Sequence, residues 1–170
     1  MKTVKRLRAL ALAGVMALAL LTGCSDSRSK AKQVEECFRS LMKTRQNVDY
    51  QKDETLDKKL EAIAQQFQPD WLDNRTGGLT EHARTIIINE LRGYLLTGSV
   101  WLWYGEVKPG QSALAQAESM KYSQGIEIAL LDSGIPTLQA IAFTMTGKKS
   151  DGHRYYLALR TNATIKTPQG

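Results

Sequence analysis

The sequence predicts an α+β domain in which three N-terminal helices pack on one face of a C-terminal antiparallel sheet of about four strands. Before Gly98, apolar residues recur at three- and four-residue steps, which is the spacing of helices with one buried face. After Gly98, stretches rich in β-branched and aromatic residues alternate with turn formers, as strands do. Helices followed by strands are typical of an α+β fold rather than of βαβ units. The length of 170 residues and the hydrophobic content of 42% suit a single domain, which we place at residues 33–167.

The first 23 residues predict a secretion signal peptide. Residues 1–8 contain basic side chains and no acidic one, and residues 9–21 form an apolar run without a charge. A helix of these residues, at about 1.5 Å each, reaches roughly 20 Å, which is less than the ~30 Å hydrocarbon core of a bilayer. We therefore expect the run to be the apolar part of a secretion signal and not a membrane span.

The residues that end this run, Leu21-Thr22-Gly23-Cys24, resemble the lipobox of bacterial lipoproteins. The resemblance implies cleavage between Gly23 and Cys24 and attachment of diacylglycerol to the Cys24 thiol. In Gram-negative bacteria it implies a further acyl chain, such as palmitate, on the new amino terminus. Two or more acyl chains give a lasting membrane anchor, whereas one binds reversibly. A secretory signal that carries a cysteine by chance is the alternative.

Ser25 follows the expected lipidated cysteine. In the lipoprotein family, aspartate at that position retains the protein in the inner membrane. The resemblance therefore implies the outer membrane of the cell envelope, with the domain facing the periplasm. Residues 24–32 are polar apart from Cys24 and Ala31 and predict a short lipidated tether.

Three amphipathic helices are expected at about residues 31–46, 54–68 and 81–96. Asp53 and Thr80 stand at the N-cap positions of the second and third helices, and Pro69 ends the second. The apolar positions are Val34, Cys37, Phe38, Leu41 and Met42 in the first helix, Leu56, Leu60, Ile63, Ala64 and Phe67 in the second, and Ala83, Ile86, Ile87, Leu91, Tyr94 and Leu95 in the third.

Four strands are expected after the helices, at about residues 99–106, 125–131, 137–146 and 153–165. Residues 112–123 fit either a helix or the start of a strand. Residues 148–152 form a hairpin loop between the last two strands, and its lysines are expected in solvent. In the last strand, alternation gives one apolar face and one mixed polar face, as in a sheet that helices cover on one side.

This order of helices and strands resembles the NTF2-like, cystatin-type folds, in which helices close over a curved sheet. The resemblance implies a pocket between the helices and the sheet that a small molecule could occupy.

No catalytic or metal-binding motif is found in the sequence. His82 and His153 are far apart and neither has a second histidine at ligand spacing. Nucleophile-elbow, P-loop, dinucleotide-binding and calcium-loop motifs are absent. We therefore predict no enzyme activity, no metal and no cofactor apart from the acyl chains on Cys24.

The charge does not indicate a nucleic acid as partner. The formal charge is +6, but four basic residues belong to the expected signal peptide. The rest of the chain has 19 basic and 17 acidic residues, a balance that leaves no strongly cationic surface for a phosphate backbone.

Aromatic residues are the candidate contacts for a ligand or a partner. Trp101 and Trp103 alternate in the expected strand 99–106 and so point the same way, beside Tyr104, and Trp71 lies in a loop. The alternative is that these residues fill the core. Cys37 lies on the apolar stripe of the first helix and is expected to be a small buried side chain rather than a disulfide partner.

Two functions remain open at this point. The first is a lipid-anchored envelope protein whose periplasmic domain binds a protein partner, as an assembly module of the envelope, of a secretion or conjugation machine, or of immunity. The second is an NTF2-like small-molecule binder or enzyme with a pocket lined by the strand aromatics.

Overall fold

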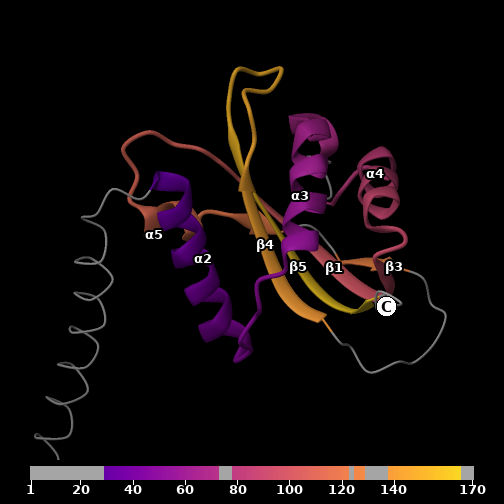
Figure 1. Cartoon of the computed structure of the whole chain (residues 1–170). Coiled ribbons are helices and arrows are strands. Elements are labelled where there is room, and N and C mark those ends of the chain that lie inside the picture. The colour runs from indigo at the N-terminus through magenta and orange to yellow at the C-terminus, as the bar shows by residue number, and fades with distance from the viewer. Residues whose placement is uncertain (1–28, 73–77, 123–124, 129–137, 166–170) are drawn as a thin grey trace, which may run out of the picture.

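The computed structural model describes residues 29–72, 78–122, 125–128 and 138–165 (Figure 1). The predicted signal peptide and the first part of the predicted tether, Cys24 included, lie outside these residues. The predicted fold class is confirmed: the three longer helices come first, and an antiparallel sheet with four strand positions fills the C-terminal half.

Each of the three longer helices begins at a side-chain cap. α2 (Lys30–Gln46) follows Ser29, α3 (Glu54–Gln66) follows Asp53 and α4 (Glu81–Leu91) follows Thr80. In each case the cap side chain accepts a hydrogen bond from a backbone N–H in the first turn, which satisfies a donor that the helix itself cannot pair. Residues 30–32, assigned to the tether from the sequence, are part of α2.

The third helix is shorter than the sequence predicts, and the following strand is longer. α4 ends at Leu91, and β1 (Leu95–Glu106) begins at Leu95, four residues before the predicted strand. Gly93 between them has a φ of +83°, a left-handed conformation that stops a helix and that glycine adopts at little cost.

The sheet has the order β2/β3–β1–β5–β4, and all pairs are antiparallel. β4 (Leu138–Met145) and β5 (Tyr155–Ile165) form the predicted hairpin. β2 (Lys121–Tyr122) and β3 (Ile126–Ile128) both pair with the edge of β1 that β5 leaves open, so they share one strand position. The ambiguous segment 112–123 contains the short helix α5 (Ala113–Glu118) and then β2, and η1 (Pro69–Trp71) is a single turn after α3.

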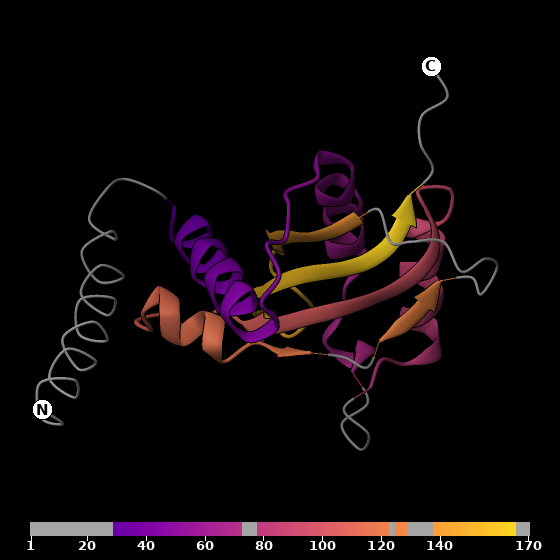
Figure 2. The ribbon, with the colours of Figure 1, turned by 90° about the horizontal axis from the view of Figure 1, so that it is seen from below.

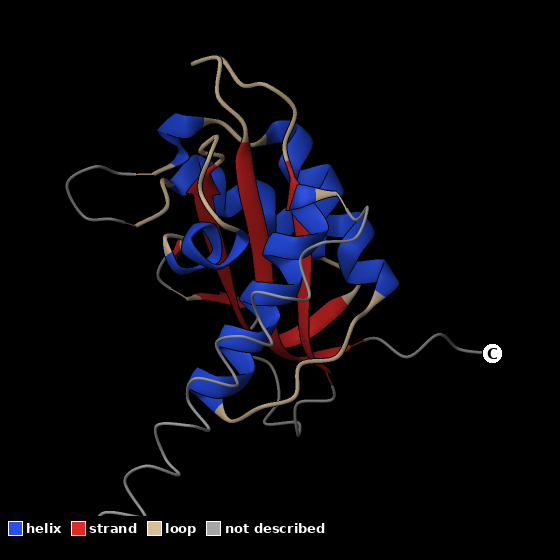
Figure 3. Cartoon of the chain, turned by 90° about the vertical axis from the view of Figure 1, so that its left-hand side faces the viewer, coloured by secondary structure: helices blue, strands red, loops and turns tan. Residues whose placement is uncertain are grey.

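Helices cover both faces of the sheet, which corrects the prediction that all three pack on one face. α3 and α4 pack on the face that carries Val100, Leu102 and Leu157, here called the α3/α4 face. α2 and α5 pack on the opposite face, here called the α2/α5 face, against Trp103 and Tyr156. α2 and α5 lie side by side in Figure 2, and Figure 3 shows helices on either side of the strands.

The reason for the second layer lies in the strands themselves. Tyr156 and Ala158 of β5, on the face interpreted as mixed polar, are buried, as is Ile141 of the neighbouring β4. Leaving these apolar side chains in water would cost about 25 cal/mol for each Å² exposed, so a helix layer on this face is strongly favoured. Cys37 of α2 is buried in the same layer, as predicted.

The chain passes from one face to the other around the β4 edge. α2 ends at Gln46, its C-cap Asn47 has a left-handed φ of 52°, and the segment that follows leads to α3 on the other face. Within it, Gln51 donates from its backbone N–H to the carbonyl of Gln139 and accepts from the N–H of Ile141. This pairing covers part of an edge strand that would otherwise present unpaired backbone groups. None of the described helices is both long enough and apolar enough to cross a bilayer.

Candidate functional site

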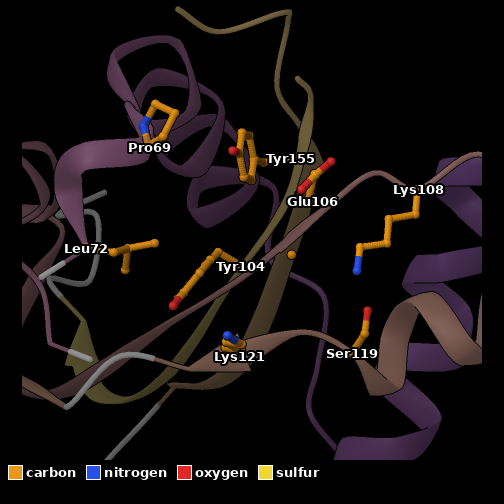
Figure 4. A pocket seen from close by; sticks show the side chains of 9 residues that line it. Pro69, Leu72, Tyr104, Glu106, Lys108, Ser119, Lys121 and Tyr155 are labelled. Carbon is orange, nitrogen blue, oxygen red and sulfur yellow. The ribbon is translucent and has the colours of Figure 1, made fainter. Parts of the chain in front are cut away.

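A cleft of about 410 Å³ opens on the α3/α4 face, where β1 ends and β5 begins (Figure 4). Strand pairing assembles its lining, because Tyr104 lies opposite Lys121 and Glu106 lies opposite Tyr155. Side chains directly opposite one another in an antiparallel pair share a face. The rest of the lining comes from β1, η1, the loops and the end of α5: Gly105, Pro69, Leu72, Lys108 and Ser119.

Two phenols form the aromatic part of the cleft. Burial raises the pKa of Tyr104 above its ordinary value of 10.0. Burial also raises the pKa of Tyr155, and the hydrogen bond that its hydroxyl donates to the Asp151 carboxylate acts in the same direction. Both phenols are therefore neutral near pH 7, and they offer ring faces rather than charge.

Charged groups border these rings. Lys108 and Lys121 each bring an ammonium group, and in Figure 4 the Lys108 ammonium points toward Ser119. Glu106 brings a carboxylate, with Oε1 at 2.9 Å from Nδ1 of His153. The cleft therefore presents two ammonium groups and one carboxylate, of which the carboxylate already has the His153 imidazole as a partner.

A buried glutamine fixes the loop that carries Lys108. Gln116 of α5 is 2% exposed, and its Nε2 donates to the carbonyl of Glu106 at 2.7 Å. Its Oε1 accepts from the backbone N–H of Lys108 at 2.9 Å. The N–H₂ and the C=O of this one buried amide both bond to the backbone of the segment that follows β1. The backbone at Glu106 and Lys108 is therefore held firmly against α5.

The hydrogen bonds of the cleft limit what its polar side chains can do. The Ser119 hydroxyl donates to the carbonyl of Gln116 at 2.8 Å, so its proton does not face a general base. Within the described part of the chain, no group of three or more acidic, histidine or cysteine side chains is placed to hold a metal ion. Neutral rings beside two ammonium groups fit a ligand, or a side chain of a partner, that combines an apolar part with an anionic group.

The four aromatic residues singled out from the sequence lie in different places. Trp71 is 2% exposed and packs against Phe67, with ring centroids 5.5 Å apart. Trp103 is buried on the α2/α5 face between Phe38 and Tyr122. The Trp71 and Trp103 side chains are therefore parts of the two hydrophobic cores.

Trp101 and Tyr104 remain candidate contacts. Tyr104 lines the cleft described above, and Trp101 lies half-buried on the opposite face of β1, next to Arg160. Trp101 and Trp103 do share a face, as their alternation predicts. The strand aromatics therefore contribute to two separate surfaces of the domain.

Sequence reasoning missed Glu106, Lys108, Lys121 and Gln116 as parts of the site. Lone lysines and a glutamine in an alanine-rich segment give no local signal. Lys121 reaches the site through the register of β1 with β2, and Gln116 reaches it through its hydrogen bonds to Glu106 and Lys108.

Comparison with known proteins adds no relative. No protein-family model, no curated protein and no solved structure matches this chain.

Proposed function

We propose that this protein is a lipid-anchored component of the bacterial cell envelope, acylated at Cys24, whose domain binds a protein partner at the membrane surface. The observation that carries the anchor is the basic start, the uncharged run 9–21 and the lipobox-like Leu21-Thr22-Gly23-Cys24 in that order. Ser25 after the cysteine supports outer-membrane sorting with the domain on the periplasmic side.

The beginning of the domain supports a location close to the membrane. The cap of α2 is Ser29, so only residues 25–28 separate the expected lipidated cysteine from the folded domain. At about 3.5 Å per extended residue, this segment spans no more than roughly 15 Å. A domain on so short a tether meets partners in or near the same membrane.

The surface of the domain supports a binding role. Tyr122 of β2 is 61% exposed and Leu96 of β1 is 45% exposed, although most other large apolar side chains of the described residues lie in the two cores. Lys121, next to Tyr122, reaches the cleft on the opposite face of the sheet. An exposed aromatic side chain is a common anchor for a protein partner.

The anchor is tested by acyl labelling of the full-length protein in a Gram-negative host. Wild type and Cys37→Ala should incorporate a labelled fatty acid, because Cys37 is buried in the α2/α5 layer. Cys24→Ala should lose the label and accumulate as a longer, unprocessed form. Normal labelling of Cys24→Ala would refute the anchor. Ser25→Asp tests sorting separately and should move the protein from outer-membrane to inner-membrane fractions.

Partner binding is tested by crosslinking the full-length lipoprotein in gently solubilised membranes. We expect one stoichiometric partner that is lost when both cleft lysines are changed, in Lys108→Glu/Lys121→Glu. Lys148→Glu, at an exposed position of the hairpin loop, is the matched control. Recovery of the same partner with the cleft variant would exclude the cleft as its binding surface.

A small-molecule ligand is the second candidate function, and the cleft itself favours it. Its volume of about 410 Å³ falls within the range of about 300–1,000 Å³ typical of ligand pockets, and a strand aromatic, Tyr104, lines it. Native mass spectrometry of the purified protein should then detect a bound mass that the Lys108→Glu/Lys121→Glu variant lacks. Recovery of the wild type alone would count against this candidate.

A further inference from the structure

A second and smaller pocket, of about 170 Å³, lies on the α2/α5 face beyond the end of α2. Its floor is formed by neighbouring strands, because Trp101 of β1 lies opposite Arg160 of β5 and Asn162 lies opposite Gln139 of β4. The remaining wall comes from the end of α2 and the segment after it, through Gln46, Val48 and Tyr50. α2 ends at this wall of the pocket, at Gln46.

The pocket contains one charge, and that charge is held in place. The guanidinium carbon of Arg160 lies 3.9 Å from the centroid of the Trp101 ring. A guanidinium stacked on an indole face gains a cation–π attraction and loses much of its side-chain freedom. The N–H groups lie in the guanidinium plane, and Arg160 is one of the residues that line the pocket.

Arg160 lacks a counter-ion among the described side chains. Its Nε is buried and has no hydrogen-bond acceptor in the described part of the chain. The side chains that line the pocket around it are neutral: Gln46, Val48, Tyr50, Trp101, Gln139 and Asn162. A buried donor without an acceptor is uncommon in folded proteins, and a charged one is especially costly.

Arg39, on the same face of the sheet, is an arginine whose guanidinium is paired within the fold. Its Nε donates to Glu35 at 2.9 Å, and its Nη2 donates to the carbonyl of Ile141, the residue opposite Arg160 on β4. Arg39 is thus paired by residues of the fold, whereas the Nε of Arg160 has no acceptor among the described residues.

We propose that the Trp101–Arg160 pair is a carboxylate-recognition site that takes an acidic group of a peptide segment. A planar guanidinium binds a carboxylate through two parallel hydrogen bonds, and the amides of Gln46, Gln139 and Asn162 supply further donors to the same oxygens. The site implies that the partner in the proposed function carries an accessible carboxylate. This inference rests on the proposed function only in taking the partner to be a protein.

The size of the pocket sets a limit on the ligand. Cavities of about 150 Å³ hold a molecule of the size of benzene, so about 170 Å³ accommodates a carboxylate on a short stem. Both an acidic side chain and a chain terminus meet this limit. The two sources share one chemistry, and the experiment separates them.

The test is a titration of the detergent-solubilised full-length protein with three short peptides, followed by NMR. The first is acetyl-Ala-Glu-Ala-amide, the second is acetyl-Ala-Gln-Ala with a free carboxyl terminus, and the third is the uncharged acetyl-Ala-Gln-Ala-amide. The Nε–H signal of Arg160 and the indole N–H signal of Trp101 report on the site. We expect saturable shifts of both signals with at least one carboxylate peptide and none with the uncharged peptide. The peptide that binds identifies the source as a side chain or a terminus.

Two variants decide whether Arg160 makes the contact. Arg160→Lys keeps the positive charge but loses the planar fork, and we expect it to weaken peptide binding by about tenfold, read from the Trp101 signal. Arg154→Lys, at an exposed position before the start of the same strand, should leave the affinity unchanged.

Three results would overturn the proposal. They are the absence of a saturable shift with either carboxylate peptide, an equal shift with the uncharged peptide, and an unchanged affinity in Arg160→Lys. None of them depends on acylation of Cys24 or on partner capture, so a failure here is distinguishable from a failure of the proposed function.

Discussion

The Lys149 ammonium lies 2.7 Å from the carbonyl oxygen of Ala64 and 3.0 Å from that of Gln65. These carbonyls belong to the last turn of α3, where no further turn supplies N–H donors. α3 has no basic residue of its own in that turn, so a residue of the β4–β5 hairpin loop caps it instead. The lysine was expected in solvent, and in the structure it ties the hairpin to a helix.

Lys149→Met should therefore destabilise the protein, because it leaves the α3 carbonyls without this donor and without a compensating charge. We expect the free energy of unfolding to fall by about 1 kcal/mol, measured by urea denaturation. Lys148→Met changes the neighbouring exposed lysine and should have an effect close to zero. Equal losses in the two variants would show that the contact with α3 contributes nothing.

Gly98 and Gly110 form a matched pair for a test of strand packing. Both have positive φ values, +128° and +83°. A Cβ atom at Gly98 would overlap with the carbonyl oxygen of Asn162 and lie 2.5 Å from Cα of Ala163, whereas a Cβ at Gly110 meets nothing within 4 Å. The backbone of β5 at this point leaves no room for a side chain on β1.

We expect Gly98→Ala to lower the free energy of unfolding by about 3 kcal/mol or more, from backbone strain and steric overlap together. Gly110→Ala carries only the left-handed strain and should cost about 1 kcal/mol. Thermal or urea denaturation of the two variants measures the difference. Similar losses would mean that the approach of β1 to β5 at Gly98 is not restrictive.

Asp57 links stability to pH. Burial raises the pKa of its carboxyl above 3.8, although Lys52 and Arg39 act in the opposite direction. The folded protein therefore holds this proton more tightly than the unfolded chain does. The stabilising contribution of the protonated group is complete below pH 3.8 and is lost as the pH rises through the raised pKa.

The consequence is a pH-dependent difference between the wild type and Asp57→Asn, which cannot titrate there. We expect the stability of the wild type relative to the variant to fall as the pH rises from about 3.5 to about 7, measured by urea denaturation at each pH. A difference that rises with pH would show that the neighbouring cations, and not burial, dominate the carboxyl.

Much of the fold could be predicted because its signals are local. Asp53 and Thr80 cap their helices as the sequence indicates, and the alternation of the last strand places its residues on the expected faces. The face that a helix covers is not a local property. The stripe of α2 shows that the helix is buried, but its place opposite α3 depends on the segment that passes around the β4 edge at Gln51.

The candidate sites were harder to predict because their residues become neighbours only through the pairing of strands that are far apart in the sequence. Trp101 was singled out as an aromatic residue, but its partner Arg160 lies on another strand and becomes its neighbour only in the β1–β5 register. Nothing in the local sequence around Arg160 separates it from a solvated strand residue. The same holds for Lys108 and Lys121 in the larger cleft.

Tyr155 connects that cleft to the hairpin loop, and this contact gives the last prediction. Its hydroxyl donates to Asp151, and this hydrogen bond is the main reason that the pKa of the Asp151 carboxyl lies below 3.8. A second hydrogen bond, from the backbone N–H of His153, acts in the same direction. Tyr155→Phe removes the first donor and leaves the second, so the pKa of Asp151 should rise toward 3.8 without a change of fold.

The measurement is an NMR titration of the Asp151 side-chain carboxyl carbon in the wild type and in Tyr155→Phe. Tyr122→Phe removes the hydroxyl of an exposed tyrosine on β2 and should leave the Asp151 titration unchanged. Because a depressed pKa means that the ionised carboxylate favours the folded state, the stability advantage of the wild type over Tyr155→Phe should be complete above pH 3.8 and should shrink as the pH falls through the depressed pKa. An Asp151 pKa that does not move in Tyr155→Phe would show that the backbone N–H of His153 alone stabilises the carboxylate. Tyr155 would then be held in the cleft by packing against Phe67, whose ring centroid lies 5.3 Å away.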